Sequence, residues 1–484
     1  MTQEVIDFYH FDSLWRIMKS EEKRGKLRAD FYSSEVKEIS RVLKSLRSQL
    51  RSSPKEERDS LQQDIQDLKD EMDERKKEEL KKKALEISRG KAKLEIECLT
   101  IKGHRAFASN NLDTVLVCQI VKQELKRCYR LYPANRDVII EQIKGLLDNS
   151  MSKIVIRADL RSFFESIPQQ GLVSKLADDG FVSKKTVKYL KGLFYAYNDK
   201  AENKEGMGLP RGLSFSSHLA ELFMRPIDER IRQTEGVYYY KRYVDDILIV
   251  ADPAKGDEEY YWDVVDGVFK ERDLALHNGS EKKYIACWDG TTMEKEFDYL
   301  GYKFVYRKGK LDVCLSQKRY QKYKTLIDAI FEIYAQCSHY RRRVDTRGQE
   351  VPRQFCYRDA LHQLFDRLEV LTSNGLLSGR KNFVATGVYY SNKHLTNLAQ
   401  LEDLDGYLAE KIDSKETFCP PANLFDYGKD NGYKKNVDLI VSKLHGFSFA
   451  RGFRERRIHK DNRFGRVLLD LQRIYYSRKD REDE

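Results

Sequence analysis

Three aspartates lie at the ends of strand-like segments, where their carboxylates could converge. Asp159 closes the β-branched run "KIVIRAD" (153–159), and Asp245 and Asp246 interrupt the apolar stretch "YYYKRYVDDILIV" (238–250). Carboxylates in such surroundings are costly unless a cation neutralises them. If the two strands are neighbours, all-oxygen donors meet at one rim of a sheet, a set that favours Mg²⁺ or Mn²⁺ and suits two-metal phosphoryl transfer. By itself, an Asp-Asp pair more often marks an ordinary turn.

A glycine-rich turn lies between these acids. The segment "GMGLPRGLSFSSHLAELFM" (206–224) leads into an amphipathic helix, and Gly208 and Gly212 permit close approach of the backbone. Such a turn can lie against a nucleotide or a base pair. Alone it is a weak signal, because similar turns precede many helices.

In this order and spacing, the segments resemble the motifs of reverse transcriptases over roughly residues 100–310. Five segments carry the resemblance: "DLRSFFESI" (159–167) for motif A, "GLPRGLSFSS" (208–217) for motif B, "YVDDILI" (243–249) for motif C, "HNGSEKKYI" (277–285) loosely for the lysine-bearing motif D, and "FDYLGYKF" (297–304) for motif E, the primer-grip hairpin. Motifs A, B, C and E in series form a specific pattern. The resemblance implies an RNA-directed DNA polymerase, a nucleotidyltransferase.

The resemblance also implies roles for the acids. Asp159 and Asp245 become the metal-binding catalytic pair, the Leu160 carbonyl a backbone ligand, and Asp246 a supporting catalytic acid. The implied cofactor is a pair of Mg²⁺ ions, for which Mn²⁺ can substitute. These ions would activate a primer 3′-hydroxyl and neutralise the leaving pyrophosphate.

Further side chains are assigned by the resemblance to the nucleotide or to the primer and template. The nucleotide set is Phe164, Arg136, Arg211, Gly212 and either Lys282 or Lys283; the primer and template set is Tyr243, Gly208, Leu300 and Gly301. Phe164 stands at the steric-gate position that selects deoxynucleotides, whereas Phe163 is expected in the core. Arg211 replaces the usual Gln of motif B, so that residue's role is not transferred to it. A surface lysine, or a surface helix start at Arg136, explains those basic residues equally well.

The implied fold is α+β: a right-hand polymerase with fingers, an RRM-like palm and a helical thumb. We expect fingers at 1–33 and 91–150, a palm with motifs A to E at 151–305, and a helical thumb with a basic C-terminal extension at 306–484. Between the finger segments, apolar residues at heptad spacing in 34–90 predict a helical hairpin insertion. That hairpin is either a solvated spacer or an oligomerisation arm. After about residue 318 the pattern is almost wholly helical.

Composition favours a polyanionic partner. The 484-residue chain has a net charge of +11, and dense arginines with nearby aromatics occur at 339–358 and 450–466. The eight cysteines are scattered without a CxxC pair, which indicates reduced thiols. No apolar run is long enough for a transmembrane helix, and no signal peptide is evident, so we expect a cytoplasmic protein without a membrane partner.

A stand-alone enzyme of this kind resembles bacterial abortive-infection and defence-associated reverse transcriptases, which are similar to retron and group II intron enzymes. The resemblance implies an RNA template, with a small noncoding RNA expected, dNTP substrates, a DNA product, antiphage defence, and a homo-oligomer or partner protein. Two alternatives stay open: a template-independent or protein-primed DNA nucleotidyl transferase at the same site, and a non-enzymatic RNA-binding module. The intact acids argue against the second.

Overall fold

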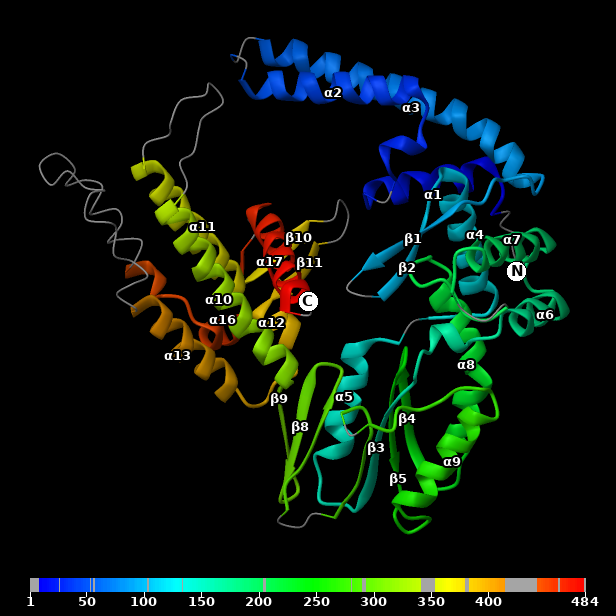
Figure 1. Ribbon diagram of the computed structural model, residues 1–484, viewed down its shortest axis with the longest axis vertical. Coiled ribbons are helices and arrows are strands. Elements are labelled where there is room, and N and C mark those ends of the chain that lie inside the picture. Colours follow the sequence, from blue (N-terminus) through cyan, green and yellow to red (C-terminus); the bar gives the residue numbers. More distant parts are fainter. Residues whose placement is uncertain are drawn as a thin grey trace, which may run out of the picture. The chain divides into compact units, whose positions relative to one another are not determined.

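The computed structural model describes residues 8–482 except 26, 53, 55–56, 102–103, 133, 203–205, 280, 290–292, 341–352, 379–382, 414–441 and 460–461 (Figure 1). Its contacts divide the chain into two compact units. The first unit comprises Met1–Ala134 and Val155–Ile285, and the second comprises Asn135–Ile154 and Ala286–Glu484. Each unit is therefore built from two separate stretches of the chain.

The first unit combines a helical part with a four-stranded sheet. Its helices are α1 (Phe11–Lys23), α2 (Ser34–Ser52), α3 (Arg58–Ser88), α4 (Leu112–Cys128), α6 (Gln169–Asp179), α7 (Lys184–Asn198), α8 (Ser216–Arg232) and α9 (Glu258–Lys270). Its strands are β1 (Ile96–Ile101), β2 (His104–Ser109), β3 (Lys153–Asp159), β4 (Val237–Tyr243), β5 (Asp246–Ala251) and β6 (Tyr284–Trp288), of which β3 and β6 run across the boundary between the units.

The sheet has the order β4-β5-β3-β6, while β1 and β2 form a separate hairpin. Strands β3 and β5 read as nearly continuous apolar runs because both of their faces are covered, and β5 is fully buried after its first residue. Helix α8 contacts β4 and packs beside α9, as Figure 1 shows. The order places β3 directly beside β5, so the segments that carry Asp159 and Asp246 are neighbours.

Helices α2 and α3 lie side by side as a long hairpin within the range predicted for one (Figure 1). The far part of α3 packs against α1 and α4 through the buried residues Leu80 and Ile87. An ion pair of 2.6 Å between Lys83 and Asp113, which is itself buried, joins α3 to α4. The hairpin is thus anchored at one end in the core of the first unit, and its role as spacer or arm stays a prediction.

The second unit contains α5 (Arg136–Leu147), α10 (Gln317–Tyr340), α11 (Arg353–Thr372), α12 (Val388–Asn392), α13 (Ala399–Asp413), α16 (Phe449–Glu455) and α17 (Asn462–Glu482). Its strands are β7 (Lys295–Tyr299), β8 (Tyr302–Arg307), β9 (Lys310–Leu315), β10 (Asn374–Ser378), β11 (Phe383–Gly387) and β12 (Ile458–His459). These form two three-stranded sheets, ordered β7-β8-β9 and β11-β10-β12.

The prediction of an almost wholly helical region after residue 318 is wrong at β10, β11 and β12. Each is only two to five residues long, and pairing between distant segments, Asn374 with Ile458 among them, makes the sheet. Local periodicity carries no signal for such pairing. The contacts place Asn135–Ile154 in the second unit, since α5 contacts β9 and the Asp148 carboxylate accepts a 2.9 Å hydrogen bond from the Leu311 amide. The boundaries of fingers, palm and thumb stay a prediction.

The arginine-rich segment 339–358 lies largely outside the described residues, so its predicted contact with nucleic acid has no structural description. Among the helices that are described, none is long and apolar enough to span a bilayer.

Gly375 should be required for the packing of β10 against α17. A Cβ placed there would lie 2.3 Å from the ring of Phe464, which is buried. Overpacking of this kind costs about 1–3 kcal/mol. We expect Gly375→Ala to lower the free energy of unfolding by that amount, measured by urea denaturation followed by circular dichroism.

Gly406→Ala provides the matched control, because no atom lies within 4 Å of a Cβ at that exposed position in α13. There the better helix propensity of alanine should stabilise by up to about 1 kcal/mol. Equal stability of the two variants would contradict the packing described for β10.

Candidate active site

Asp159 is the last residue of β3, and backbone hydrogen bonds join it and its neighbour Leu160 to two other segments. The Leu160 amide donates to the Asp245 carbonyl at 3.2 Å, and the His277 amide donates to the Asp159 carbonyl at 2.9 Å. The Asp159 side chain is buried, with only 6 % of the residue exposed. The end of β3, the β4–β5 turn and the segment at 275–277 therefore meet at one point of the first unit.

Asp245 and Asp246 lie at the turn between β4 and β5, which the pairing of Tyr243 with Asp246 closes. The turn is strained, because Val244 has a φ of 60°, a conformation that is unfavourable for a β-branched residue. Arg242 stabilises it by donating a 2.9 Å hydrogen bond to the Val244 carbonyl. The predicted hairpin turn for the acidic pair is present in the structure.

Buried Arg242 also joins this turn to α8. Its guanidinium donates to both carboxylate oxygens of Asp228 at 2.9 and 3.0 Å, and to both of Glu221 at 2.8 and 3.0 Å. Burial alone lowers the pKa of Arg242, but the hydrogen bonds and charges of Asp228 and Glu221 raise it overall. These hydrogen bonds neutralise the buried Arg242 charge and fix the position of the turn relative to α8.

The three acids repel one another. Burial raises the pKa of Asp245, and the neighbouring charge of Asp159 raises it further. Burial likewise raises the pKa of Asp246, although Arg157 opposes that effect. The electrostatics therefore favour a cation at this place.

Basic side chains stand close to the acids. Lys282 Nζ lies 2.6 Å from Asp159 Oδ2, His277 Nε2 lies 3.5 Å from the same oxygen, and Arg157 Nη2 lies 3.5 Å from Asp246 Oδ1. Within the described residues, no three Asp, Glu, His or Cys side chains already stand in metal-ligand geometry. The donor chemistry fits a hard divalent ion, which would have to compete with Lys282 for Asp159.

The surroundings of Asp245 and Asp246 differ. The Asp245 carboxylate faces a cavity of about 530 Å³ that also borders Leu160, Lys282 and Arg211. No described side chain forms an ion pair with Asp245, whereas Asp246 is paired with Arg157 and does not line the cavity. The division between a metal ligand and a supporting acid stays a prediction.

Arg211 covers the predicted gate residue. Its guanidinium lies 5.3 Å above the Phe164 ring and forms two hydrogen bonds, of 2.7 and 3.0 Å, to Glu165. Phe163 is 1 % exposed and belongs to the core, as expected. The positive charge that replaces the usual Gln is thus largely compensated by Glu165.

The glycines of the 206–213 loop are needed for close packing. Gly212 has a φ of +100°, and a Cβ there would lie 2.5 Å from the Phe107 carbonyl oxygen of β2. The Gly208 amide donates to the Ile167 carbonyl at 2.8 Å. The loop is therefore fastened to both the β1–β2 hairpin and the segment that follows Asp159.

The structure separates the two candidate lysines. Lys282 contacts Asp159 and lines the cavity. Lys283 instead lies 3.7 Å from the centroid of the Trp262 ring in α9. Sequence reasoning could not distinguish them, because they are adjacent and only the local course of the chain decides which one faces the acids.

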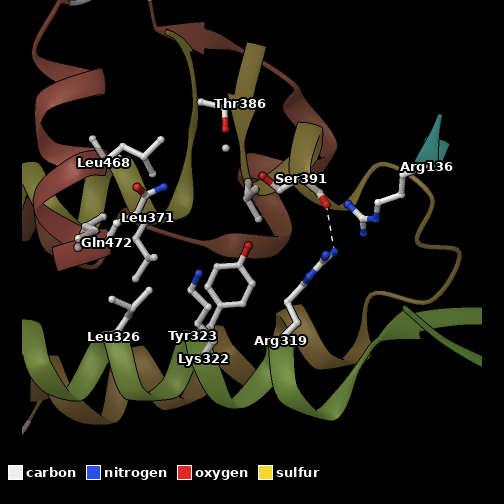
Figure 2. Close-up of a pocket in the computed structure, with 14 residues that line it drawn as sticks. Arg136, Arg319, Lys322, Tyr323, Leu326, Leu371, Thr386, Ser391, Leu468 and Gln472 are labelled. Carbon is white, nitrogen blue, oxygen red and sulfur yellow. Dashed lines mark hydrogen bonds between the residues drawn. The ribbon is translucent and has the colours of Figure 1, made fainter. Parts of the chain in front are cut away.

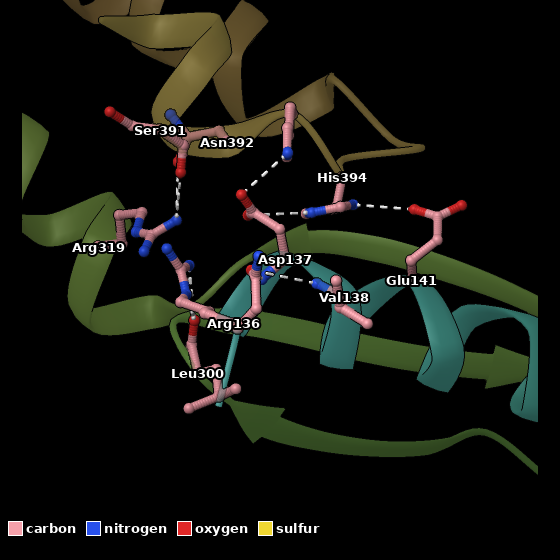
Figure 3. Close-up of polar contacts among 11 residues, drawn as sticks. Arg136, Asp137, Val138, Glu141, Leu300, Arg319, Ser391, Asn392 and His394 are labelled. Carbon is pink, nitrogen blue, oxygen red and sulfur yellow. Dashed lines mark hydrogen bonds and ion pairs between the residues drawn. The ribbon is translucent and has the colours of Figure 1, made fainter. Parts of the chain in front are cut away.

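Leu300, Gly301 and Arg136 belong to the second unit. Leu300 and Gly301 form the two-residue β7–β8 turn, with φ of 47° and 77°. Arg136, the first residue of α5, donates two hydrogen bonds to the Leu300 carbonyl, at 2.7 and 2.9 Å (Figure 3). A Cβ on Gly301 would lie 2.5 Å from Arg319 Nη2. In this structure Arg136 stabilises the turn, and nucleotide binding by Arg136 stays a prediction.

Four contributors were missed from the sequence: Arg157, Arg242, His277 and Arg105. Arg157 and Arg242 are charged residues inside strands that are otherwise apolar or aromatic, which is a usable signal for a buried ion pair. His277 and Arg105, which lines the same cavity as Asp245, carry no signal, since their positions depend on the course of loops and of the β1–β2 hairpin.

Comparison with known proteins supports the interpretation of these motifs. Residues 80–304 match the family described as reverse transcriptase (RNA-dependent DNA polymerase). The match indicates a reverse transcriptase domain over these residues, in a family described as RNA-dependent DNA polymerases. No curated protein matches the chain.

Among solved structures, apo telomerase from Candida tropicalis is 11 % identical over 80 % of this chain and 65 % of its own, with a TM-score of 0.35. The same enzyme in complex with the TWJ fragment of telomeric RNA is 11 % identical over 75 % and 64 %, with a TM-score of 0.33. A form truncated from the C-terminal domain is 13 % identical over 41 % and 45 %, at 0.30. The chain thus spans about half to two thirds of these telomerases, and scores this low do not demonstrate a shared overall fold.

Removing one charge from the acidic cluster should stabilise the metal-free protein. Because the folded state raises the pKa of Asp245 above 3.8, the native protein holds that proton more tightly than the unfolded chain does. The ionised carboxylate therefore lowers the free energy of unfolding at neutral pH, and it has no such effect well below pH 3.8, where the group is protonated in both states. In EDTA at neutral pH, we expect Asp245→Asn to raise the free energy of unfolding by about 1 kcal/mol, the usual size of a stabilising substitution. In acid we expect no change.

Asp263→Asn, at an exposed position of α9, serves as the control and should leave unfolding unchanged. Thermal denaturation at both pH values measures the effect. Destabilisation by Asp245→Asn at neutral pH would show that its charge is compensated in the native state.

Proposed function

We propose that the reverse transcriptase domain copies RNA into DNA from dNTPs, with Asp159 and Asp245 as its metal-binding catalytic pair. The observation that carries this proposal is the convergence of the two acidic segments, joined by the hydrogen bond from the Leu160 amide to the Asp245 carbonyl. The raised pKa values of Asp245 and Asp246 support it, since burial raises both, the charge of Asp159 adds to both, and that of Asp245 adds to the shift of Asp246. The domain match supplies the reaction class.

Asp159, Asp245 and the Leu160 carbonyl would hold divalent ions, Mg²⁺ by preference and Mn²⁺ as a substitute, and Asp246 would support them. Such ions polarise phosphoryl oxygens and favour the deprotonated form of an attacking hydroxyl. Arg157 forms an ion pair with Asp246, and Arg242 holds the β4–β5 turn in position through the Val244 carbonyl. Lys282, once it leaves Asp159, can donate a proton or a hydrogen bond to the leaving phosphate.

The cavity beside Asp245 is the proposed nucleotide site. Phe164 does not itself line this cavity, but it lies beneath Arg211, which does and which is held by Glu165. We assign to Phe164 the aromatic surface for the sugar. Gly212 allows the backbone of the loop to approach closely. We assign Tyr243 and Gly208, and Leu300 and Gly301 of the second unit, to the primer and template.

Several finer features of the proposal rest on the sequence resemblance. They are a small noncoding RNA as template, assembly as a homo-oligomer or with a partner protein, a role in bacterial antiphage defence, and a cytoplasmic location. The net charge of +11 favours a nucleic acid partner.

Loss of either catalytic aspartate should abolish DNA synthesis while leaving RNA binding intact. Since a metal supplies several kcal/mol of transition-state stabilisation, we expect Asp159→Asn and Asp245→Asn each to slow primer extension by about 10³-fold or more. Asp263→Asn should extend at the parental rate. Extension on an RNA template with Mg²⁺ and dNTPs measures the rate, and filter binding measures RNA affinity.

Retained synthesis in both aspartate variants would refute the site. Incorporation without RNA, giving product attached to the protein, would instead favour the template-independent or protein-primed alternative.

The two adjacent lysines provide a matched test of the proton donor. Lys282→Ala should lower the rate of nucleotide addition by about 100-fold, within the usual contribution of general acid catalysis. Lys283→Ala should stay within about twofold, because Lys283 contacts the Trp262 ring. Pre-steady-state incorporation separates this rate from nucleotide affinity. Equal losses in both variants would contradict the assignment of Lys282.

A further inference from the structure

A second cavity, of about 360 Å³, lies wholly within the second unit. Helix α10 forms its floor, and α11, α12, α17 and β11 contribute its other walls, as Figure 2 shows. Its size falls within the range of small-ligand sites, roughly 300–1,000 Å³. The motifs that resemble a polymerase do not account for it.

One end of this cavity is cationic. Arg136 and Arg319 line this end, whereas Lys322 lies on the other side of the Tyr323 ring, with its Nζ 4.8 Å from the centroid of the Tyr475 ring. None of the fourteen described lining residues is acidic. The side-chain partners of Arg319 are neutral: its Nη1 donates to the Ser391 carbonyl at 3.1 Å and to Asn392 Oδ1 at 2.9 Å. These contacts orient the guanidinium without neutralising it, so the charge is available to an anion.

The opposite end is apolar. Leu326, Leu371 and Leu468 gather there, with the Tyr323 ring between them and Arg319 (Figure 2). Leu326 and Leu371 are 5 % and 7 % exposed, so they are part of the core of this unit. Such a surface suits a flat or hydrophobic group and gains nothing from a bare inorganic anion.

Two polar groups face the apolar end. The Thr386 hydroxyl and the Gln472 amide line the cavity, and neither side chain is hydrogen-bonded to another described residue. An amide offers a donor and an acceptor together, which complement the edge of a nucleobase. The Tyr323 hydroxyl accepts a 3.0 Å hydrogen bond from Asn392 and is thereby held in position.

We propose that this cavity binds a nucleoside phosphate. The phosphate lies against Arg319 beside Arg136, the base lies between Tyr323 and the leucines near Lys322, and its edge faces Thr386 and Gln472. No carboxylate lines the cavity among the described residues, so its positive charge is left to the phosphate. The ligand is either a free nucleotide or the phosphorylated end of a nucleic acid.

The test is isothermal titration of the full-length Asp245→Asn protein with AMP in EDTA, conditions that silence the proposed polymerase site. AMP should bind at least about tenfold more tightly than inorganic phosphate, since the base contributes apolar burial. Decanoate, which has a charge and an apolar body but no base edge, should bind more weakly than AMP. A short 5′-phosphorylated DNA that binds better than AMP would identify the nucleic acid end as the ligand, and one that binds worse would identify the free nucleotide.

Two variants change the cavity, one in its charge and one in its apolar volume. Lys322→Glu reverses one charge, and Leu468→Trp fills the apolar end; each should weaken AMP binding at least about tenfold. Lys318→Glu makes the same charge change at an exposed position of α10 outside the lining and should bind as the parent does.

Circular dichroism melting identifies any variant that has lost its fold. Unchanged AMP affinity in both folded cavity variants, an equal loss in Lys318→Glu, or equal affinity for AMP and phosphate would each overturn the proposal. Because the titrated protein carries Asp245→Asn, failure of polymerase activity leaves this result unaffected.

Discussion

The crowding of three carboxylates at the end of β3 is the constraint on which the first unit depends. Asp159, Asp245 and Asp246 are partly or fully buried; burial raises the pKa of the latter two, and the charges of neighbouring carboxylates raise it further. A fold tolerates such an arrangement only with compensating cations nearby. Lys282 and Arg157 supply them here, and a divalent metal would supply more charge at the same place.

The strained turn beneath the acids is kept in place by Arg242. Its five hydrogen bonds reach Asp228 and Glu221 on α8 and the Val244 carbonyl in the turn. Helix α8 follows the glycine-rich loop, so the same network links the turn to the loop that covers Phe164. A buried pair that loses one partner costs several kcal/mol, which makes Arg242 a structural requirement for the site.

Much of this site could be predicted from the sequence, since motif order and β-branched runs indicate neighbouring strands around Asp159 and Asp245. The roles of the basic residues could not. Lys282 and Lys283 are adjacent in the sequence, which does not show that Lys283 contacts the Trp262 ring. Nor does the sequence show that Arg136 donates a hydrogen bond to the Leu300 carbonyl. The short strands β10 to β12 were missed because pairing between distant segments creates them. Local patterns determine which elements form, whereas long-range packing decides which way a charge faces.

We propose that Asp159 and Asp245 form a cation site, which the Lys282 ammonium partly fills at 2.6 Å from Asp159. Titration of the protein with Mn²⁺, followed by electron paramagnetic resonance of the free ion, measures this directly and needs no primer, template or nucleotide. We predict Mn²⁺ uptake by the parent protein, tighter uptake by Lys282→Ala, and loss of that uptake in Asp159→Asn. Equal Mn²⁺ binding by the parent and Asp159→Asn would contradict it.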